Sequence, residues 1–186
     1  EARGSSQYHV WSHVSGAVCP VTHSFATNLL CGEWFKGPLR GGQLYADLVS
    51  RDTYRPRYLS QPWGIPNTFL PICTGRPETA SAQSQAILAH ILPQGGPLFV
   101  RYVDPKVWQP IVGAMLAFDT RAARFTPPWQ DNPMLTIDAP GDVLVGTWDR
   151  DGEVFIAIGN IGDKPASVTL RSRGPAMRWL WIYPER

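Results

Sequence analysis

The sequence predicts an α/β part followed by an all-β part: the C-terminal portion of a (β/α) barrel and then a small antiparallel β-sandwich module. Three observations predict this architecture. Short apolar segments alternate with helical patterns in the first two thirds of the chain, a Pro-rich segment follows at 126–133, and apolar residues then recur with a period of two. We expect residues 1–128 to belong to the barrel-like part and residues 129–186 to form the β-sandwich-like module.

The barrel-like part contains three apolar segments that we expect to be buried strands, at residues 8–15, 24–31 and 65–73. Three strands are too few to close an eight-stranded barrel. Residues 36–42 are rich in Gly and predict a flexible loop, whereas residues 43–49 space their apolar side chains like a short helix.

Two longer helices are expected after the third strand. The first covers residues 79–92, where Ala and Gln fill the helix and a Pro-Gln-Gly-Gly-Pro segment ends it. The second covers residues 105–123, with Asp104 as N-cap and Pro105 at the first helical position.

The β-sandwich-like module is expected to contain five short strands separated by Asp-Gly and Gly-Asp turns, at residues 134–137, 143–148, 154–159, 167–170 and 177–183. We expect no helix between Val143 and Leu170. The side chains expected to pack on the preceding helices are Val143, Val145, Phe155, Ile158 and Leu180.

Composition and charge indicate which kinds of binding partner to expect. The chain has 186 residues, of which 44% are hydrophobic and 17% charged, so it can bury a sizeable core. The net charge is +2 and the basic residues are scattered, so no nucleic-acid partner is expected. No apolar run approaches the length of a membrane span, so no membrane partner is expected. The N-terminal residues do not read as a signal peptide or an initiator Met; they indicate a piece of something longer or a processed chain, and leave localisation open.

The three cysteines, Cys19, Cys31 and Cys73, are widely spaced and form no Cys-x-x-Cys motif. They suit buried free thiols, although one disulfide remains open. We expect no metal site, because the spacing of His13, His23 and Glu33 matches no standard ligand set. No cofactor is expected either, since P-loop and dinucleotide fingerprints are missing from the sequence.

Glu33 is the candidate catalytic residue. It follows an apolar segment and Gly32, and the aromatic pair Trp34 and Phe35 comes directly after it. A carboxylate can act as acid or base on a sugar, and aromatic rings can stack on the C–H faces of sugars. The structural alternative is a salt bridge from Glu33 to Arg40 or Arg55.

Five further residues are candidates for substrate binding. A hydrogen bond or a stacking contact with a sugar is the role considered for each. The alternative is a satisfied core histidine for His13 and core packing for the aromatic rings. Asp47 and Asp52 are candidates for a second carboxylate beside Glu33. The substrate-binding candidates are His13, Ser15, Trp34, Trp63 and Asp47.

The chain resembles, over nearly its whole length, the C-terminal portion of glycoside-hydrolase-like proteins related to glycoside hydrolase family 123 and their uncharacterised relatives. The order of short motifs carries this resemblance, together with the two helices. These motifs are His13-Val-Ser15, Ser24-Phe25, Gly32-Glu33, Tyr45-Ala-Asp47, Tyr54-Arg55, Trp63-Gly64, Phe69-Leu70-Pro71, Phe125 with Trp129, and Val154 to Asn160.

The resemblance implies a (β/α) barrel with a C-terminal β-sandwich that hydrolyses glycosidic bonds, with N-acetylgalactosaminides as the substrates of the characterised enzymes. In that family the acetamido group of the substrate is the nucleophile, assisted by an adjacent Asp-Glu pair. This sequence contains no such pair, and in the family the pair lies upstream of the part matched here. The same resemblance favours a secreted or extracytoplasmic location.

Three hypotheses follow for the chain. It is the C-terminal part of a glycoside hydrolase whose main catalytic pair lies outside it, with a carbohydrate as substrate. Alternatively, it is a non-catalytic carbohydrate-binding module that uses Trp148, Trp179 and Trp181. In the third hypothesis it is a structural piece whose exposed sheet edge is covered by the missing N-terminal part of the barrel or by a second copy.

Overall fold

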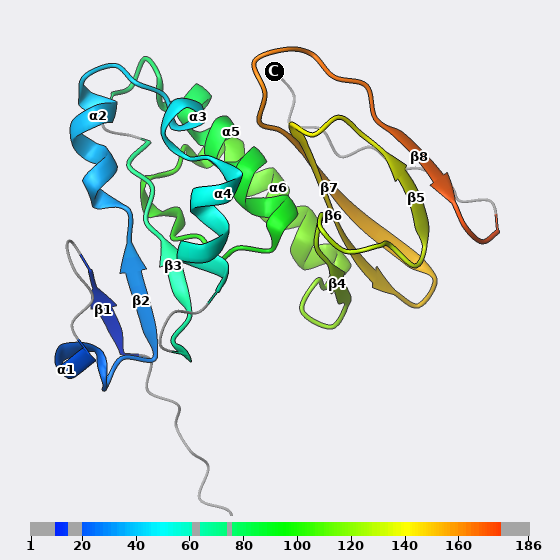
Figure 1. The fold of residues 1–186 in the computed structure, drawn as a ribbon, viewed down its shortest axis with the longest axis horizontal. Coiled ribbons are helices and arrows are strands. Elements are labelled where there is room, and N and C mark those ends of the chain that lie inside the picture. The colour runs from blue at the N-terminus through cyan, green and yellow to red at the C-terminus, as the bar shows by residue number, and fades with distance from the viewer. Residues whose placement is uncertain (1–9, 15–19, 61–63, 74–75, 176–186) are drawn as a thin grey trace, which may run out of the picture.

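The computed structural model describes residues 10–14, 20–60, 64–73 and 76–175, and shows a mixed fold of helices and small sheets (Figure 1). A parallel sheet lies at one end, two antiparallel sheets lie at the other, and helices α5 and α6 lie between them. The described residues form no closed barrel.

The parallel sheet consists of β1 (Trp11–His13), β2 (Asn28–Cys31) and β3 (Asn67–Phe69), in the order β1-β2-β3. Both pairings are parallel, and Phe69 makes a further parallel bridge to Leu98. Each strand lies beside the next one along the chain. The three predicted strands are therefore present, although each is shorter than its apolar segment.

The two faces of the parallel sheet differ in their surroundings. One face carries Leu29, Cys31 and Phe69, which are buried in the core with residues of α4 and α5. The register places Trp11 and His13 on the opposite face, where the Trp11 side chain is 47% exposed and its ring lies 6.0 Å from that of Phe99. Helices cover the first face, and the second is the more open and polar.

Short helical segments connect β1, β2 and β3. They are α1 (Pro20–His23), the 3₁₀ turn η1 (Glu33–Phe35), α2 (Lys36–Arg40), α3 (Tyr45–Leu48), α4 (Arg51–Tyr54) and the π-helical turn η2 (Arg55–Leu59). The loop predicted at 36–42 is wrong in its first part, which is α2. Buried Leu39 anchors this helix in the core, and Pro38 is tolerated because it lies in the first turn.

The two predicted longer helices are confirmed as α5 (Ala80–Ile91), which continues into the 3₁₀ turn η4 (Leu92–Gln94), and α6 (Pro105–Phe118), which follows the 3₁₀ turn η5 (Val100–Tyr102). The carboxylate of Asp104 accepts a hydrogen bond from the backbone N–H of Lys106, as expected of an N-cap. Helix α6 ends five residues earlier than predicted, because Asp119 adopts a left-handed conformation (φ 58°).

The β part contains two antiparallel sheets. Strands β4 (Arg124–Thr126), β6 (Val143–Arg150) and β7 (Glu153–Asn160) form the first, in the order β4-β6-β7, and β5 (Leu135–Asp138) pairs with β8 (Thr169–Ser172) in the second. Every residue from 143 to 170 is described and none is helical, as predicted. The strand predicted at 177–183 lies outside the described residues, and β4 was not predicted.

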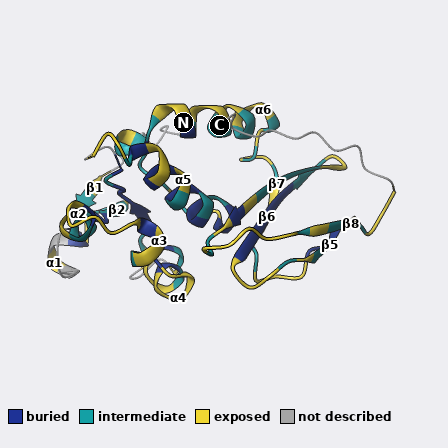
Figure 2. Cartoon of the chain, turned by 90° about the horizontal axis from the view of Figure 1, so that it is seen from above, coloured by how far each residue is buried: buried dark blue, intermediate teal, exposed yellow. Residues whose placement is uncertain are grey.

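The sheet of β6 and β7 packs directly on α5 and η4 through two glycines. A Cβ atom on Gly159 would lie 1.8 Å from the carbonyl oxygen of Ala89 in α5, and one on Gly146 would lie 1.9 Å from that of Pro93 in η4. The two backbones are therefore in contact with no side chain between them. Figure 2 shows buried residues gathered in α5 and β6.

The predicted contacts of this sheet with the helices are partly wrong. Phe155 does face the helical side, 5.7 Å from the ring of Phe118 in α6. Side chains alternate along a strand, so Gly146 and Gly159 on the helical face leave Val145 and its partner Ile158 on the other. Val143 and Val145 are buried there, and Ile158 is 41% exposed. Leu180 lies outside the described residues.

Trp148 belongs to the core. Its ring lies 4.6 Å from that of Phe125 and 5.8 Å from that of Phe155, and the residue is only 6% exposed. It therefore has no face for a glycan, which corrects the binding-module hypothesis at this residue. Trp179 and Trp181 lie outside the described residues.

Candidate functional site at the carboxyl edge of the parallel sheet

Glu33 and His13 meet where β1 and β2 end. The Glu33 Oε1 atom lies 3.6 Å from Nε2 of His13, and the two side chains are 41% and 43% exposed. The structural alternative was a salt bridge from Glu33 to Arg40 or Arg55. Glu33 lies beside His13 instead. The carboxyl edge of a parallel sheet thus holds one carboxylate and one imidazole, both open to solvent.

Gly32 sets the position of Glu33. Its φ of 143° is strained for any residue with a side chain, and a Cβ there would lie 2.4 Å from the backbone oxygen of Leu70. The lack of a side chain at Gly32 therefore allows the backbone of Leu70 to approach closely. The chain turns sharply after β2 and enters η1, whose first residue is Glu33.

The aromatic residues after Glu33 lie against protein groups. The guanidinium of Arg57 lies 3.8 Å from the centre of the Trp34 ring, which occupies one face of that ring. The Phe35 ring lies 5.8 Å from both Tyr45 and Phe69 in the core. Core packing is therefore the structural role of Phe35, and Trp34 is packed between Arg57 and the edge of the same core.

The remaining candidates make their contacts elsewhere or are not described. The Asp47 carboxylate accepts a hydrogen bond from the backbone N–H of Leu44 (3.0 Å), which caps the start of α3. Asp52 lies 3.8 Å from Nε of Arg51 and its side chain is 89% exposed. Ser15 and Trp63 lie outside the described residues.

A buried polar network beneath this edge was not predicted from the sequence. The Cys31 thiol donates to Oδ1 of Asn67 (3.0 Å), and Nδ2 of Asn67 donates to the backbone oxygen of Arg57 (2.9 Å). Burial raises the pKa of the Cys31 thiol, while Tyr58, Asn67 and Arg57 act in the opposite direction. The network ties β2 and β3 to η2, so it fixes the residue that covers Trp34.

The other histidines and cysteines among the described residues are structural. His23 and His90 are buried, and burial lowers the pKa of His90 to about 4. Cys31 and Cys73 are buried free thiols, as expected, and Cys19 lies outside the described residues. Within the described ranges no three His, Cys, Asp or Glu side chains gather into a metal site.

Comparisons with known proteins add no relative to this description. A scan against models of protein families finds no match, and searches of curated proteins and of solved structures find no similar protein. Within the described residues, no helix has the length and apolar character needed to cross a membrane.

Proposed function

We propose that this chain forms the C-terminal strands and the following β module of a glycoside hydrolase, with the main catalytic pair outside it. The observation that carries the proposal is the pair of Glu33 and His13, 3.6 Å apart at the carboxyl ends of neighbouring parallel strands. In (β/α) barrels this edge of the sheet holds the active site.

Two features of the fold support a barrel-type parent. The strand order β1-β2-β3, followed by the bridge to Leu98, keeps sequence order across the sheet, as in a singly wound barrel. Helices cover one face of this sheet, as they cover the outside of a barrel, and His13 lies on the opposite face. The antiparallel sheets then follow, in the order that the family resemblance implies.

The chemistry available to Glu33 and His13 suits a sugar. The carboxylate offers two acceptor oxygens for hydroxyl protons, and the imidazole ring offers two nitrogens that can take part in hydrogen bonds. In the intact enzyme these groups hydrogen-bond the sugar, or they orient the catalytic pair and influence its charge. The proposed substrate class is a glycan. The resemblance to glycoside hydrolase family 123 makes N-acetylhexosaminides the first substrates to test.

The test is the kinetics of Glu33→Gln in the natural full-length protein, with aryl N-acetylhexosaminides as substrates. This change keeps the shape of the side chain and removes its charge. We expect turnover to fall on the order of a hundredfold, with little change in melting temperature. Glu153→Gln is the matched control, because Glu153 is exposed on β7, and it should leave the kinetics unchanged.

Two outcomes would contradict the proposal. Unchanged turnover in Glu33→Gln would remove Glu33 from the site. The 186-residue chain by itself is expected to hydrolyse nothing, because it lacks the adjacent Asp-Glu pair. Hydrolysis of a simple glycoside by this chain alone would contradict the half-barrel interpretation.

A further inference from the structure

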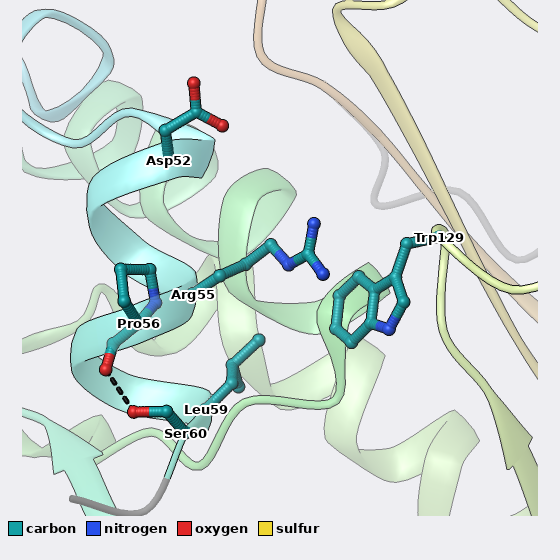
Figure 3. A pocket seen from close by; sticks show the side chains of 6 residues that line it. All are labelled: Asp52, Arg55, Pro56, Leu59, Ser60 and Trp129. Atoms are coloured by element: carbon teal, nitrogen blue, oxygen red, sulfur yellow. Dashed lines mark hydrogen bonds between the residues drawn. The ribbon is translucent and has the colours of Figure 1, made fainter.

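A groove lies away from Glu33, where α4 and η2 face the loop before β5. Arg55, Pro56, Leu59 and Ser60 form one wall, Asp52 lies at the top, and Trp129 forms the opposite wall (Figure 3). The groove continues along β5 and β6 past Arg51, Asp131 and Arg173. It is open to solvent along its length, so it suits an extended ligand.

The π-helical geometry of η2 builds the first wall. Hydrogen bonds in a π-helix connect residues i and i+5, and such turns occur often at functional sites. Arg55 and Leu59 therefore share one side of the turn and point toward Trp129 (Figure 3), and Ser60 lines the groove at the end of the turn. Tyr58 instead points into the core, and Arg57 covers Trp34. The Ser60 hydroxyl donates to the backbone oxygen of Pro56 and closes the turn.

Arg55 carries the unbalanced charge of the groove. The guanidinium of Arg173 makes two hydrogen bonds to the carboxylate of Asp131, at 2.7 and 3.0 Å. Arg51 lies 3.8 Å from Asp52 and donates to the backbone oxygen of Gly141. No carboxylate among the described residues lies within ion-pair distance of Arg55. Because Asp131 pairs with Arg173 and Asp52 pairs with Arg51, the positive charge of Arg55 remains for a ligand.

The Arg55 guanidinium is also held in place. It lies 4.0 Å above the centre of the Trp129 ring, a contact that holds its planar fork while its N–H groups stay free to bond a carboxylate. Trp129 is 43% exposed, so its ring still offers apolar surface to a ligand. The Asp52 carboxylate, at the top of the groove, can accept hydrogen bonds from the hydroxyl groups of the same ligand.

We propose that this groove binds an acidic saccharide, with a uronate carboxylate on Arg55 and a sugar ring against Trp129. Arg55, held by Trp129, offers the contact for a carboxylate. The exposed part of the Trp129 ring offers apolar surface for the sugar that carries it, and a neutral sugar would leave the charge of Arg55 without a partner. The site is separate from Glu33 and does not depend on hydrolysis, so it stands whether or not the proposed function holds.

The test compares two probes that differ only in the carboxylate: cellobiose, and the disaccharide in which its non-reducing glucose is oxidised to glucuronate. Binding to the full chain is measured by calorimetry and by the shift of the Trp129 indole N–H signal in NMR spectra. We expect the acidic disaccharide to bind at least about ten times more tightly than cellobiose. Glu33→Gln should bind it unchanged, which separates this groove from the candidate active site.

Variants assign the contacts. Arg55→Gln should abolish the preference for the acidic disaccharide, and Trp129→Phe should weaken its binding several-fold while the melting temperature confirms folding. Arg121→Gln is the matched control, because this exposed arginine is not part of the groove, and it should change nothing. Equal binding of both probes, an unchanged preference in Arg55→Gln, or equally tight binding of inorganic phosphate would overturn the proposal.

Discussion

The contact of two glycines with helix backbones predicts a large loss of stability on adding one methyl group. The Cβ of Gly146→Ala would lie 1.9 Å from the Pro93 oxygen, and that of Gly159→Ala 1.8 Å from the Ala89 oxygen. Ordinary contact begins at 3.4 Å, so the strands must move away by about 1.5 Å in either variant. Neither obstacle is a flexible side chain that could rotate aside.

We expect each variant to lower the free energy of unfolding by about 3 kcal/mol, at the upper end of overpacking costs. In a chain of this size that corresponds to a melting temperature lower by about 6–12 °C. Urea unfolding, followed by tryptophan fluorescence and by circular dichroism, measures the change. The double variant should cost less than the sum of the two, because a sheet displaced by one methyl group already makes room for the second.

Gly113→Ala is the control for the glycine substitution itself. Gly113 is exposed in the middle of α6, with nothing within 4 Å of an added Cβ. The change should therefore raise stability by about 0.5–1 kcal/mol, the helix-propensity gain of Ala over Gly. Values within about 0.5 kcal/mol of wild type for both Gly146→Ala and Gly159→Ala would refute the backbone contact between the sheet and α5.

Three further predictions follow. The pKa of His90 is about 4 in the folded protein against an ordinary value of 6.5, so the unfolded chain takes up the proton first as the pH falls. Between pH 7 and pH 4 the free energy of unfolding, measured by urea titration, should therefore drop by about 3 kcal/mol more in wild type than in His90→Gln. An equal dependence of stability on pH in the two proteins would contradict this. Asn132→Ala should lower stability by about 2–4 kcal/mol in the same assay, because this buried side chain donates to Thr147 and accepts two backbone N–H groups; a change below about 0.5 kcal/mol would show that the network is dispensable. Burial raises the pKa of the Cys73 thiol to about 12, so at pH 8 a disulfide reagent followed by mass spectrometry should label it at least about 100 times more slowly in the native chain than in urea, and similar rates would contradict its burial.

The sequence by itself determined the type and order of most elements. Apolar runs predicted the three strands of the first sheet, and Ala-rich periodicity and the Asp104-Pro105 start predicted the two longer helices. Alternation with Asp-Gly turns predicted the antiparallel strands. These signals are local, because the period of the side chains and the identity of the capping residue suffice to specify them.

Helix α3 lies within the short helix predicted at residues 43–49, whereas α2 and β4 escaped sequence analysis. Helix α2 contains Gly37 and Pro38, whose propensities oppose a helix, and it forms because Leu39 is buried. Strand β4 has only three residues, too few to show a period of two, and they pair with β6 where the chain returns to it after α6. Tertiary contacts override local propensity in such segments.

The candidate site divides in the same way. Sequence position identified Glu33, because an apolar strand that ends in a Gly and an acid is a local pattern. The tertiary structure alone decided three contacts of the site: His13 lies beside Glu33, Arg57 covers Trp34, and Arg55 lies on Trp129 and not beside Glu33. Arg55 and Trp129 are more than seventy residues apart, and no pattern in the sequence encodes which side chains meet across such a distance, since that depends on how the sheets pack on α5.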